Sequence, residues 1–254
     1  ASPLAALGGT DSGGQNVYVG QLALQMEQKG YDIDIFTRWD NPSLPRVVAY
    51  SAGIRVVHVK AGPVAPIAKE EILCYMDDFR KDMLRFMNMQ RLKYKLIHAN
   101  FFMSGLVAMQ LKETLAIPFV ITFHALGQVR KIFQKEQDHF PAQRIEIEAA
   151  IVKQADRVIA ECPQDFEDLV NFYHADPQKI STIPCGFNPL EFFPMDKKSS
   201  KKRMNIAENE RMILQLGRMV PRKGIDNVIK ALPLVNLGGQ TVKLMIVGGE
   251  SGEQ

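Results

Sequence analysis

Residues 212–224 read MILQLGRMVPRKG. A short apolar run ends at Gly217, and two cationic side chains, Arg218 and Lys223, then flank a proline turn. Apolar residues at helical spacing follow. Open α/β sheets bind ligands just beyond the carboxyl ends of their strands, and Arg and Lys at such a point can hold phosphate oxygens. The stretch therefore predicts strand, phosphate-binding turn and helix, with a solvated basic turn as the alternative reading of the two cations.

The same alternation of strand and helix patterns runs through the rest of the chain. The predicted strands are 31–36, 54–60, 96–99, 119–123, 157–160, 180–183, 212–216 and 243–247. The predicted helices are 16–29, 69–91, 103–115, 144–154, 163–173 and 225–235. Alternation on this scale is typical of the α/β class, in which helices cover both faces of a parallel sheet.

The alternation pauses once, and the pause predicts a domain boundary. Residues 189–208 carry two prolines, two serines and a lysine cluster, which is typical of a solvated linker. We therefore expect an amino-terminal domain over 1–188, a linker over 189–208, and the start of a second Rossmann-like domain over 209–254. This last part is shorter than the roughly 100–150 residues of a typical domain, so we expect it to be incomplete.

Composition excludes several classes of function. The chain of 254 residues is 46% hydrophobic and 23% charged, as in globular proteins, and its net charge of +3 is too small to indicate a nucleic-acid partner. The three cysteines are scattered, which fits a reducing cytoplasm. No apolar run is long enough for a membrane span. Docking to a membrane surface through the basic residues of 81–95 is a minor alternative. The sequence does not indicate an oligomeric state.

Polar residues follow several of the predicted strands. They are His98, Asn100, His124, Glu161, Gly186, Asn188, Arg218 and Lys223. Because parallel strands share one carboxyl edge, these residues predict the rim of a single cleft. For His98, the alternative is a histidine that is buried in the core with its hydrogen bonds formed.

The amino-terminal loop GGTDSGGQ, residues 8–15, leads into an amphipathic helix. Gly13 and Gly14 leave backbone amides bare at the helix start, where an anion is favoured, although a flexible turn is the alternative. The loop is neither a P-loop nor a Rossmann fingerprint. The pair Asp32 and Asp34 lies inside a strand pattern, so no metal site is predicted.

Together these motifs resemble one known family. They are the segments 8–19, 31–38, 155–160, 183–187 with 193–194, and 216–224. In this order they are similar to family 4 of the retaining glycosyltransferases, nearest to its sucrose-phosphate synthase and mycothiol glycosyltransferase groups. The resemblance implies a GT-B fold, with two Rossmann-like domains that hold the acceptor and the nucleotide sugar. It also places the family's Glu-x7-Glu motif beyond residue 254.

The resemblance also implies roles for individual residues. Arg218 and Lys223 match the pair that binds the donor diphosphate, and Gly13 and Gly14 match the loop that meets the donor phosphate. His124 matches the histidine beside the transferred sugar. The implied catalytic residues are thus His124, Arg218 and Lys223.

On the acceptor side, Lys69 and Arg144 match residues that bind an anionic group, and Asn100 is assigned to the same site. Phe101 and Ala125 replace hydroxyl side chains of the inositol-phosphate enzymes, so we expect a different acceptor.

The implied reaction moves a hexosyl group, with retention, from a UDP- or GDP-sugar such as UDP-glucose to a sugar, polyol or sugar-phosphate acceptor. Charge on the leaving diphosphate would be stabilised by side-chain cations and amides, so we expect neither a metal nor a cofactor. No carboxylate stands out as a nucleophile. Two alternatives remain: a phosphorylase on the same fold, and a binding module or inactive fragment.

Overall fold

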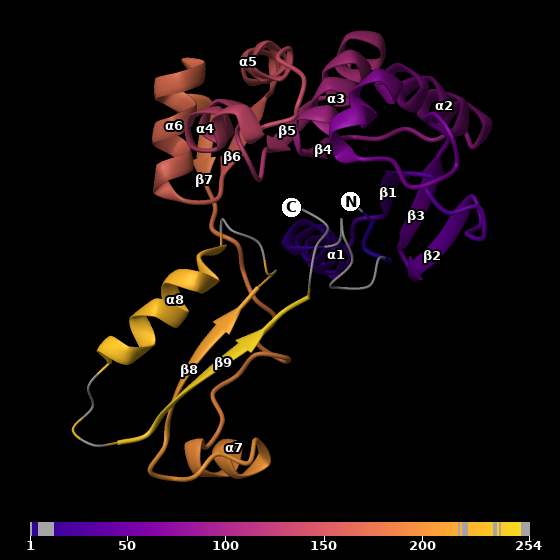
Figure 1. Ribbon diagram of the computed structural model, residues 1–254. Helices are drawn as coiled ribbons and strands as arrows, with labels where there is room; N and C mark the ends of the chain where they lie inside the picture. Colours follow the sequence, from indigo (N-terminus) through magenta and orange to yellow (C-terminus); the bar gives the residue numbers. More distant parts are fainter. Residues whose placement is uncertain are drawn as a thin grey trace. The chain divides into compact units, whose positions relative to one another are not determined.

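The computed structural model describes residues 2–4, 13–217, 219, 223–235, 238 and 240–249. The chain divides into two compact units (Figure 1). One unit is Tyr18–Gly186, and the other contains residues of the stretches 3–17 and 187–254. Parallel strands alternate with helices in both, so the predicted α/β class is confirmed.

The larger unit contains two sheets. The first has the order β1-β3-β2, with β1 (Ile33–Arg38) parallel to β3 (Ile54–Val59) and β2 (Val47–Ser51) antiparallel at one edge. The second has the order β4-β5-β6-β7 and is parallel throughout. Its strands are β4 (Ile97–Asn100), β5 (Phe119–Thr122), β6 (Arg157–Ala160) and β7 (Ile180–Thr182).

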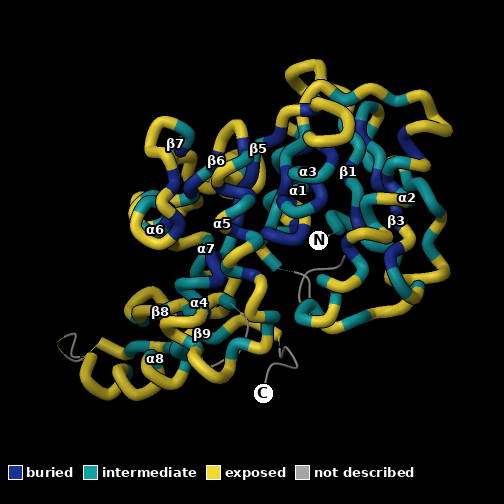
Figure 2. Tube along the Cα trace, turned by 90° about the horizontal axis from the view of Figure 1, so that it is seen from above, coloured by how far each residue is buried: buried dark blue, intermediate teal, exposed yellow. Residues whose placement is uncertain are grey.

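Helices pack against these sheets. Their bounds are α1 (Gly14–Glu27), η1 (Lys69–Tyr75), α2 (Met76–Met89), α3 (Phe102–Leu115), α4 (Gly127–Gln134), η2 (Lys135–Gln137), α5 (Arg144–Gln154), α6 (Pro163–Tyr173) and η3 (Pro177–Lys179). Helix α3 contacts β4, β5 and α5, while α6 contacts β6 and β7. The main apolar core lies around the second sheet, where α2, α3, α5 and α6 contribute buried side chains. The buried segments gather in this region (Figure 2). Side chains such as Phe102, Phe119 and Ile151 are completely buried there, each contributing about 1.5–3 kcal/mol.

Local signals explain where individual helices begin and end. Gly30 has a φ of 87°, and its amide donates to the carbonyl of Glu27, so it ends α1 in the left-handed conformation that glycine favours. Pro163 occupies the first turn of α6, where its missing N–H leaves no hydrogen bond unmade. Both positions confirm the sequence pattern.

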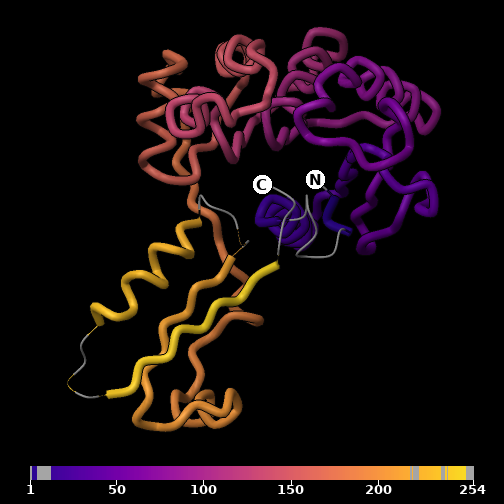
Figure 3. The backbone as a smooth tube through the Cα atoms, in the orientation of Figure 1, coloured from indigo at the N-terminus to yellow at the C-terminus, as the bar shows by residue number. Residues whose placement is uncertain are grey.

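The smaller unit carries a two-stranded parallel sheet of β8 (Arg211–Leu216) and β9 (Val242–Val247), which lie side by side in the tube of Figure 3. Between them in sequence come α8 (Ile225–Ala231) and η5 (Leu232–Leu234). The side chains of both strands are exposed or half-buried.

A helix, α7 (Lys197–Arg203), lies within the segment predicted as a linker. The Asp196 carboxylate caps it by accepting hydrogen bonds from the Ser199 amide at 2.8 Å and hydroxyl at 2.7 Å. Lysines and Arg203 in the last turn complement the helix dipole. Capping and dipole terms thus stabilise a short helix that the sequence pattern did not predict, and the linker over 189–208 stays a prediction.

Other elements also differ from the sequence pattern. Every predicted strand has a counterpart, but β2 and α4 were not predicted, and β2 makes the first sheet mixed rather than purely parallel. The predicted helix 69–91 divides into η1 and α2. Within the described part of the chain, no helix combines the length and apolar character that crossing a bilayer requires.

Candidate functional site

The strand register of the second sheet brings three polar residues to one edge. Asn100, at the end of β4, pairs with Thr122 of β5, which in turn pairs with Ile159 of β6. His124 lies two residues after Thr122, and Glu161 lies two residues after Ile159. Parallel strands leave the sheet in the same direction, so these side chains meet beyond its carboxyl edge.

His124 lies at the centre of this group. Its Nδ1 is 3.0 and 3.1 Å from the two carboxylate oxygens of Glu161, and its Nε2 is 2.9 Å from Oδ1 of Asn100. The His124 and Glu161 side chains retain only 12% and 18% of their exposure. His124 has a φ of 59°, a left-handed conformation that is uncommon outside glycine and that tends to occur at functional sites.

Two further side chains pack around the imidazole. Nε2 of His98 is 2.9 Å from the Thr122 hydroxyl. The ring of Tyr18, from α1, meets the His124 ring edge-on with centroids 5.0 Å apart. Burial, and then the neighbouring charge on His124, lowers the pKa of His98 to about 4. His98 is therefore a neutral core histidine, the alternative considered for it from the sequence.

Glu161 links this group to the segment after β7. The Cys185 thiol donates to Oε1 of Glu161 at 3.0 Å. The backbone amide of Glu161 donates to the Asp165 carboxylate at 3.0 Å. The hydrogen bond from His124 holds the pKa of Glu161 below its usual range, although burial opposes this shift. Desolvation, followed by the nearby Glu161 charge, raises the pKa of the Cys185 thiol to about 11, so Cys185 remains a donor.

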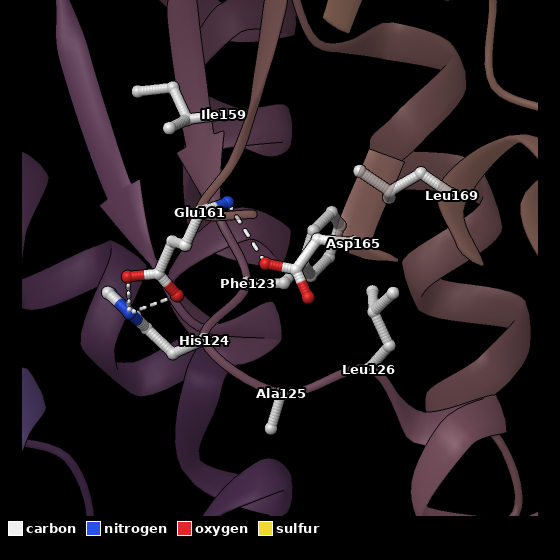
Figure 4. Close-up of a pocket in the computed structure, with 8 residues that line it drawn as sticks. All are labelled: Phe123, His124, Ala125, Leu126, Ile159, Glu161, Asp165 and Leu169. Carbon is white, nitrogen blue, oxygen red and sulfur yellow. Dashed lines mark hydrogen bonds and ion pairs between the residues drawn. The ribbon is translucent and has the colours of Figure 1, made fainter. Parts of the chain in front are cut away.

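A small cavity lies beside His124 and Glu161 (Figure 4). Its lining is Phe123, His124, Ala125, Leu126, Ile159, Glu161, Asp165 and Leu169. The cavity holds about 20 Å³, which is room for a single water molecule and not for a sugar.

Arg144 lies at the start of α5 and is almost completely buried. Its Nε donates to Glu148 at 2.7 Å, and its Nη2 donates to the Ala125 carbonyl at 2.6 Å. Phe101, Phe102 and Phe140 surround the guanidinium, with ring centroids 4.6–5.0 Å from its central carbon. Among the described residues, nothing accepts a hydrogen bond from the buried Nη1.

Glu148 compensates the charge of Arg144. Besides Arg144 it accepts hydrogen bonds from the Gly127 amide at 2.8 Å and from the Tyr173 hydroxyl. A larger cavity of about 180 Å³ lies next to this cluster. Its lining includes Arg144 and two further cationic residues, Lys131 and Lys135, together with Asp138.

The remaining predicted site residues lie elsewhere in the chain. Lys69 is the first residue of η1, in the same unit as His124. Gly13 and Gly14 stand at the start of α1, where an added Cβ would meet no atom within 4 Å. Lys223 is exposed, and its carbonyl accepts from Gln215 at 3.5 Å. Arg218 and the loop 8–12 lie outside the described residues.

Of the predicted site residues, the structure thus brings together Asn100 and His124. It adds Glu161, Cys185 and Tyr18 to this group. Glu161 carried a usable signal, because it follows a predicted strand just as His124 does, but it was not assigned to the site. Cys185 also follows a predicted strand, next to Gly186, but was not assigned, and Tyr18 carried no signal because it comes from a helix. No group of three or more potential metal ligands occurs among the residues that the structure describes.

Parallel sheets with helices between their strands define an α/β protein, and the structural neighbours of this chain have the GT-B fold. Residues 12–190 match the model of Glycosyltransferase Family 4, and residues 196–254 match that of glycosyl transferases group 1. The chain belongs to Glycosyltransferase Family 4, which confirms the resemblance found in its sequence.

Individual relatives agree with this assignment. The chain is 33% identical over its whole length to a D-inositol 3-phosphate glycosyltransferase of Acidothermus cellulolyticus, covering 58% of that protein. It is 31% identical, with a TM-score of 0.87, to the sucrose-phosphate synthase of Thermosynechococcus elongatus, covering 99% of this chain and 61% of that one. HepE of Anabaena, solved with UDP and glucose, shares the fold at 15% identity and a TM-score of 0.65, over 96% and 59% of the two chains.

Proposed function

We propose that the protein containing this chain is a retaining hexosyltransferase. It transfers the sugar of a UDP- or GDP-sugar to a sugar, polyol or sugar-phosphate acceptor. The match of residues 12–190 to Glycosyltransferase Family 4 is the observation that carries this proposal. The names of the relatives, a D-inositol 3-phosphate glycosyltransferase and a sucrose-phosphate synthase, support sugar transfer to a polyol phosphate or sugar phosphate.

The donor diphosphate is held by cations and by bare backbone amides. In sequence, Arg218 and Lys223 both follow shortly after the end of β8. Gly13 and Gly14 leave open space at the amino-terminal end of α1, a position where a helix favours an anion. As the donor bond breaks, negative charge develops on the diphosphate, and these groups stabilise it.

The sugar is transferred beside His124. The bond between C1 and the diphosphate oxygen breaks, and a bond between C1 and the acceptor oxygen forms on the same face. The acceptor proton passes to the departing phosphate, which acts as the base. Both ring nitrogens of His124 face oxygen acceptors within 3.1 Å, which supports a role in orienting the sugar rather than in removing the proton.

The acceptor is bound by Lys69, Asn100 and Arg144. The unpaired Nη1 of Arg144, and the cationic residues lining the adjacent cavity, support an acceptor that carries an anionic group. Phe101 packs its ring over the same guanidinium, and Ala125 has no hydroxyl. The acceptor therefore differs from that of the inositol-phosphate enzymes.

A transfer assay tests this proposal. The natural protein that contains this chain is incubated with UDP-glucose or a GDP-hexose and a set of sugars, polyols and sugar phosphates. Mass spectrometry is expected to detect a glycosylated acceptor together with UDP or GDP. A sugar phosphate formed from inorganic phosphate without any nucleotide would favour the phosphorylase instead. Calorimetric binding of the donor without turnover would favour a binding module.

A further inference from the structure

The two polar partners of the His124 ring share one property: both present acceptor oxygens. Nδ1 faces the Glu161 carboxylate, and Nε2 faces Oδ1 of Asn100, whose amide nitrogen donates to the His98 carbonyl at 3.4 Å. A neutral imidazole has one N–H and one lone pair, so it satisfies only one of two acceptors. The imidazolium form satisfies both.

We propose that Glu161 is a positioning residue that holds His124 as a doubly protonated imidazolium, hydrogen-bonded through Nδ1 to Glu161 and through Nε2 to Asn100. The inference rests on the proposed function only in that it places the transferred sugar beside this ring. Under this arrangement His124 has no lone pair and cannot act as a general base. It supplies a fixed positive charge beside the transferred sugar.

The surroundings of the ring favour the ion pair. Glu161 is the carboxylate hydrogen-bonded to the ring, and its Oε1 is further stabilised by the Cys185 thiol. The hydrogen bond from His124 is the main cause that lowers the pKa of Glu161. Charge-assisted hydrogen bonds of this kind are about twice as strong as neutral ones, so removing the carboxylate removes the main stabilisation of the cation.

The other titratable groups near the ring come from four elements. His98 on β4 is uncharged, because its pKa is about 4. Tyr18 on α1 presents its ring edge-on and stays neutral, since burial raises the pKa of its hydroxyl. Asp165 on α6 lines the adjacent cavity and accepts from the Glu161 backbone amide. The Cys185 thiol, after β7, is also uncharged, with a pKa of about 11.

The protonation state of His124 can be read without any substrate. In the natural protein, nitrogen-15 correlation spectra at neutral pH are expected to show protons on both ring nitrogens of His124, identified among the histidine signals by the one lost in His124→Gln. In Glu161→Gln, one ring nitrogen is expected to lose its proton. A neutral His124 ring in the unmodified protein at neutral pH would overturn the proposal.

Kinetics then separate positioning from a merely structural role. We expect Glu161→Gln to lower kcat on the order of 100-fold, the scale of losing one preorganised electrostatic group, with little change in donor KM. Glu161→Asp, which keeps the carboxylate, should restore most of the rate. Equal rates for the unmodified protein and Glu161→Gln would contradict the proposal. If the protein transfers no sugar at all, the spectra still decide the state of His124, so the two failures are distinguishable.

Discussion

Nε of Arg144 lies 2.7 Å from Oε1 of Glu148, one helical turn further along α5, and neither side chain reaches solvent to more than 2%. The pair is also the junction of several elements, because Glu148 accepts from the amide of Gly127 and from the hydroxyl of Tyr173. A buried ion pair contributes little net stability, but the loss of one partner leaves a buried charge unpaired.

Replacement of Glu148 should therefore be strongly destabilising. We expect Glu148→Gln to lower the free energy of unfolding by about 3–5 kcal/mol, as measured by urea denaturation. Asp77→Asn is the matched control, since Asp77 forms ion pairs with Arg80 and Lys81 on the exposed face of α2 and should contribute far less. Equal losses in the two variants would show that Glu148 does not hold the cluster together.

His98 should make stability depend on pH. Its pKa is about 4 in the fold, below the roughly 6.5 of an unfolded histidine, so the unfolded chain binds the proton more readily. The contribution of neutral His98 is complete above about pH 6.5 and is lost progressively as pH falls to 4, by at most about 3 kcal/mol. Comparison of Tm across this window with that of His98→Gln isolates the effect. The variant should have a flatter profile, and a parallel one would contradict the assignment.

Gly14→Ala should weaken donor binding while leaving the stability of the fold almost unchanged. An added Cβ meets no atom within 4 Å, so we expect the free energy of unfolding to change by less than about 1 kcal/mol. A methyl group at the start of α1 should nevertheless keep a phosphate from approaching the backbone closely. Calorimetry with the nucleotide sugar should show weaker binding. Unchanged affinity in a folded variant would exclude Gly14 from the phosphate site.

Arg218 and Lys223, which follow β8 in sequence, should contribute to the turnover rate. Arg218→Ala and Lys223→Ala, made in the natural protein, are each expected to reduce kcat by about 10²–10³-fold, the loss typical of one group that stabilises a developing charge. Lys230→Ala is the control, because Lys230 is exposed on α8 and its ion pair is with Asp226, four residues earlier. Near-normal rates in both test variants would exclude a diphosphate clamp.

Much of the fold followed from local patterns. Buried strands such as β5 and β6 are short apolar runs, and Gly30 and Pro163 mark helix boundaries through backbone geometry. Strand β2 was missed because its position depends on antiparallel pairing with β3 rather than on a distinctive pattern of its own. Helix α7 was missed because a run of lysines and serines has little helical character until Asp196 caps it.

The site was predicted only in part, for a similar reason. Residues directly after strands, such as Asn100 and His124, can be assigned to one edge, since parallel strands share a direction. Glu161 and Cys185 could be placed near that edge in the same way, but their hydrogen bonds to one another and to His124 depend on tertiary packing, which periodicity does not report. The same holds for Arg144, whose burial under three aromatic rings depends on residues from different segments.

The anomeric configuration of the transfer product tests the central claim most directly. Proton NMR of the product formed from an α-linked UDP- or GDP-hexose is expected to show an α-glycoside, with one nucleoside diphosphate released for each sugar transferred. A β-glycoside, or free hexose and nucleotide without a glycosylated acceptor, would contradict the account of a retaining hexosyltransferase.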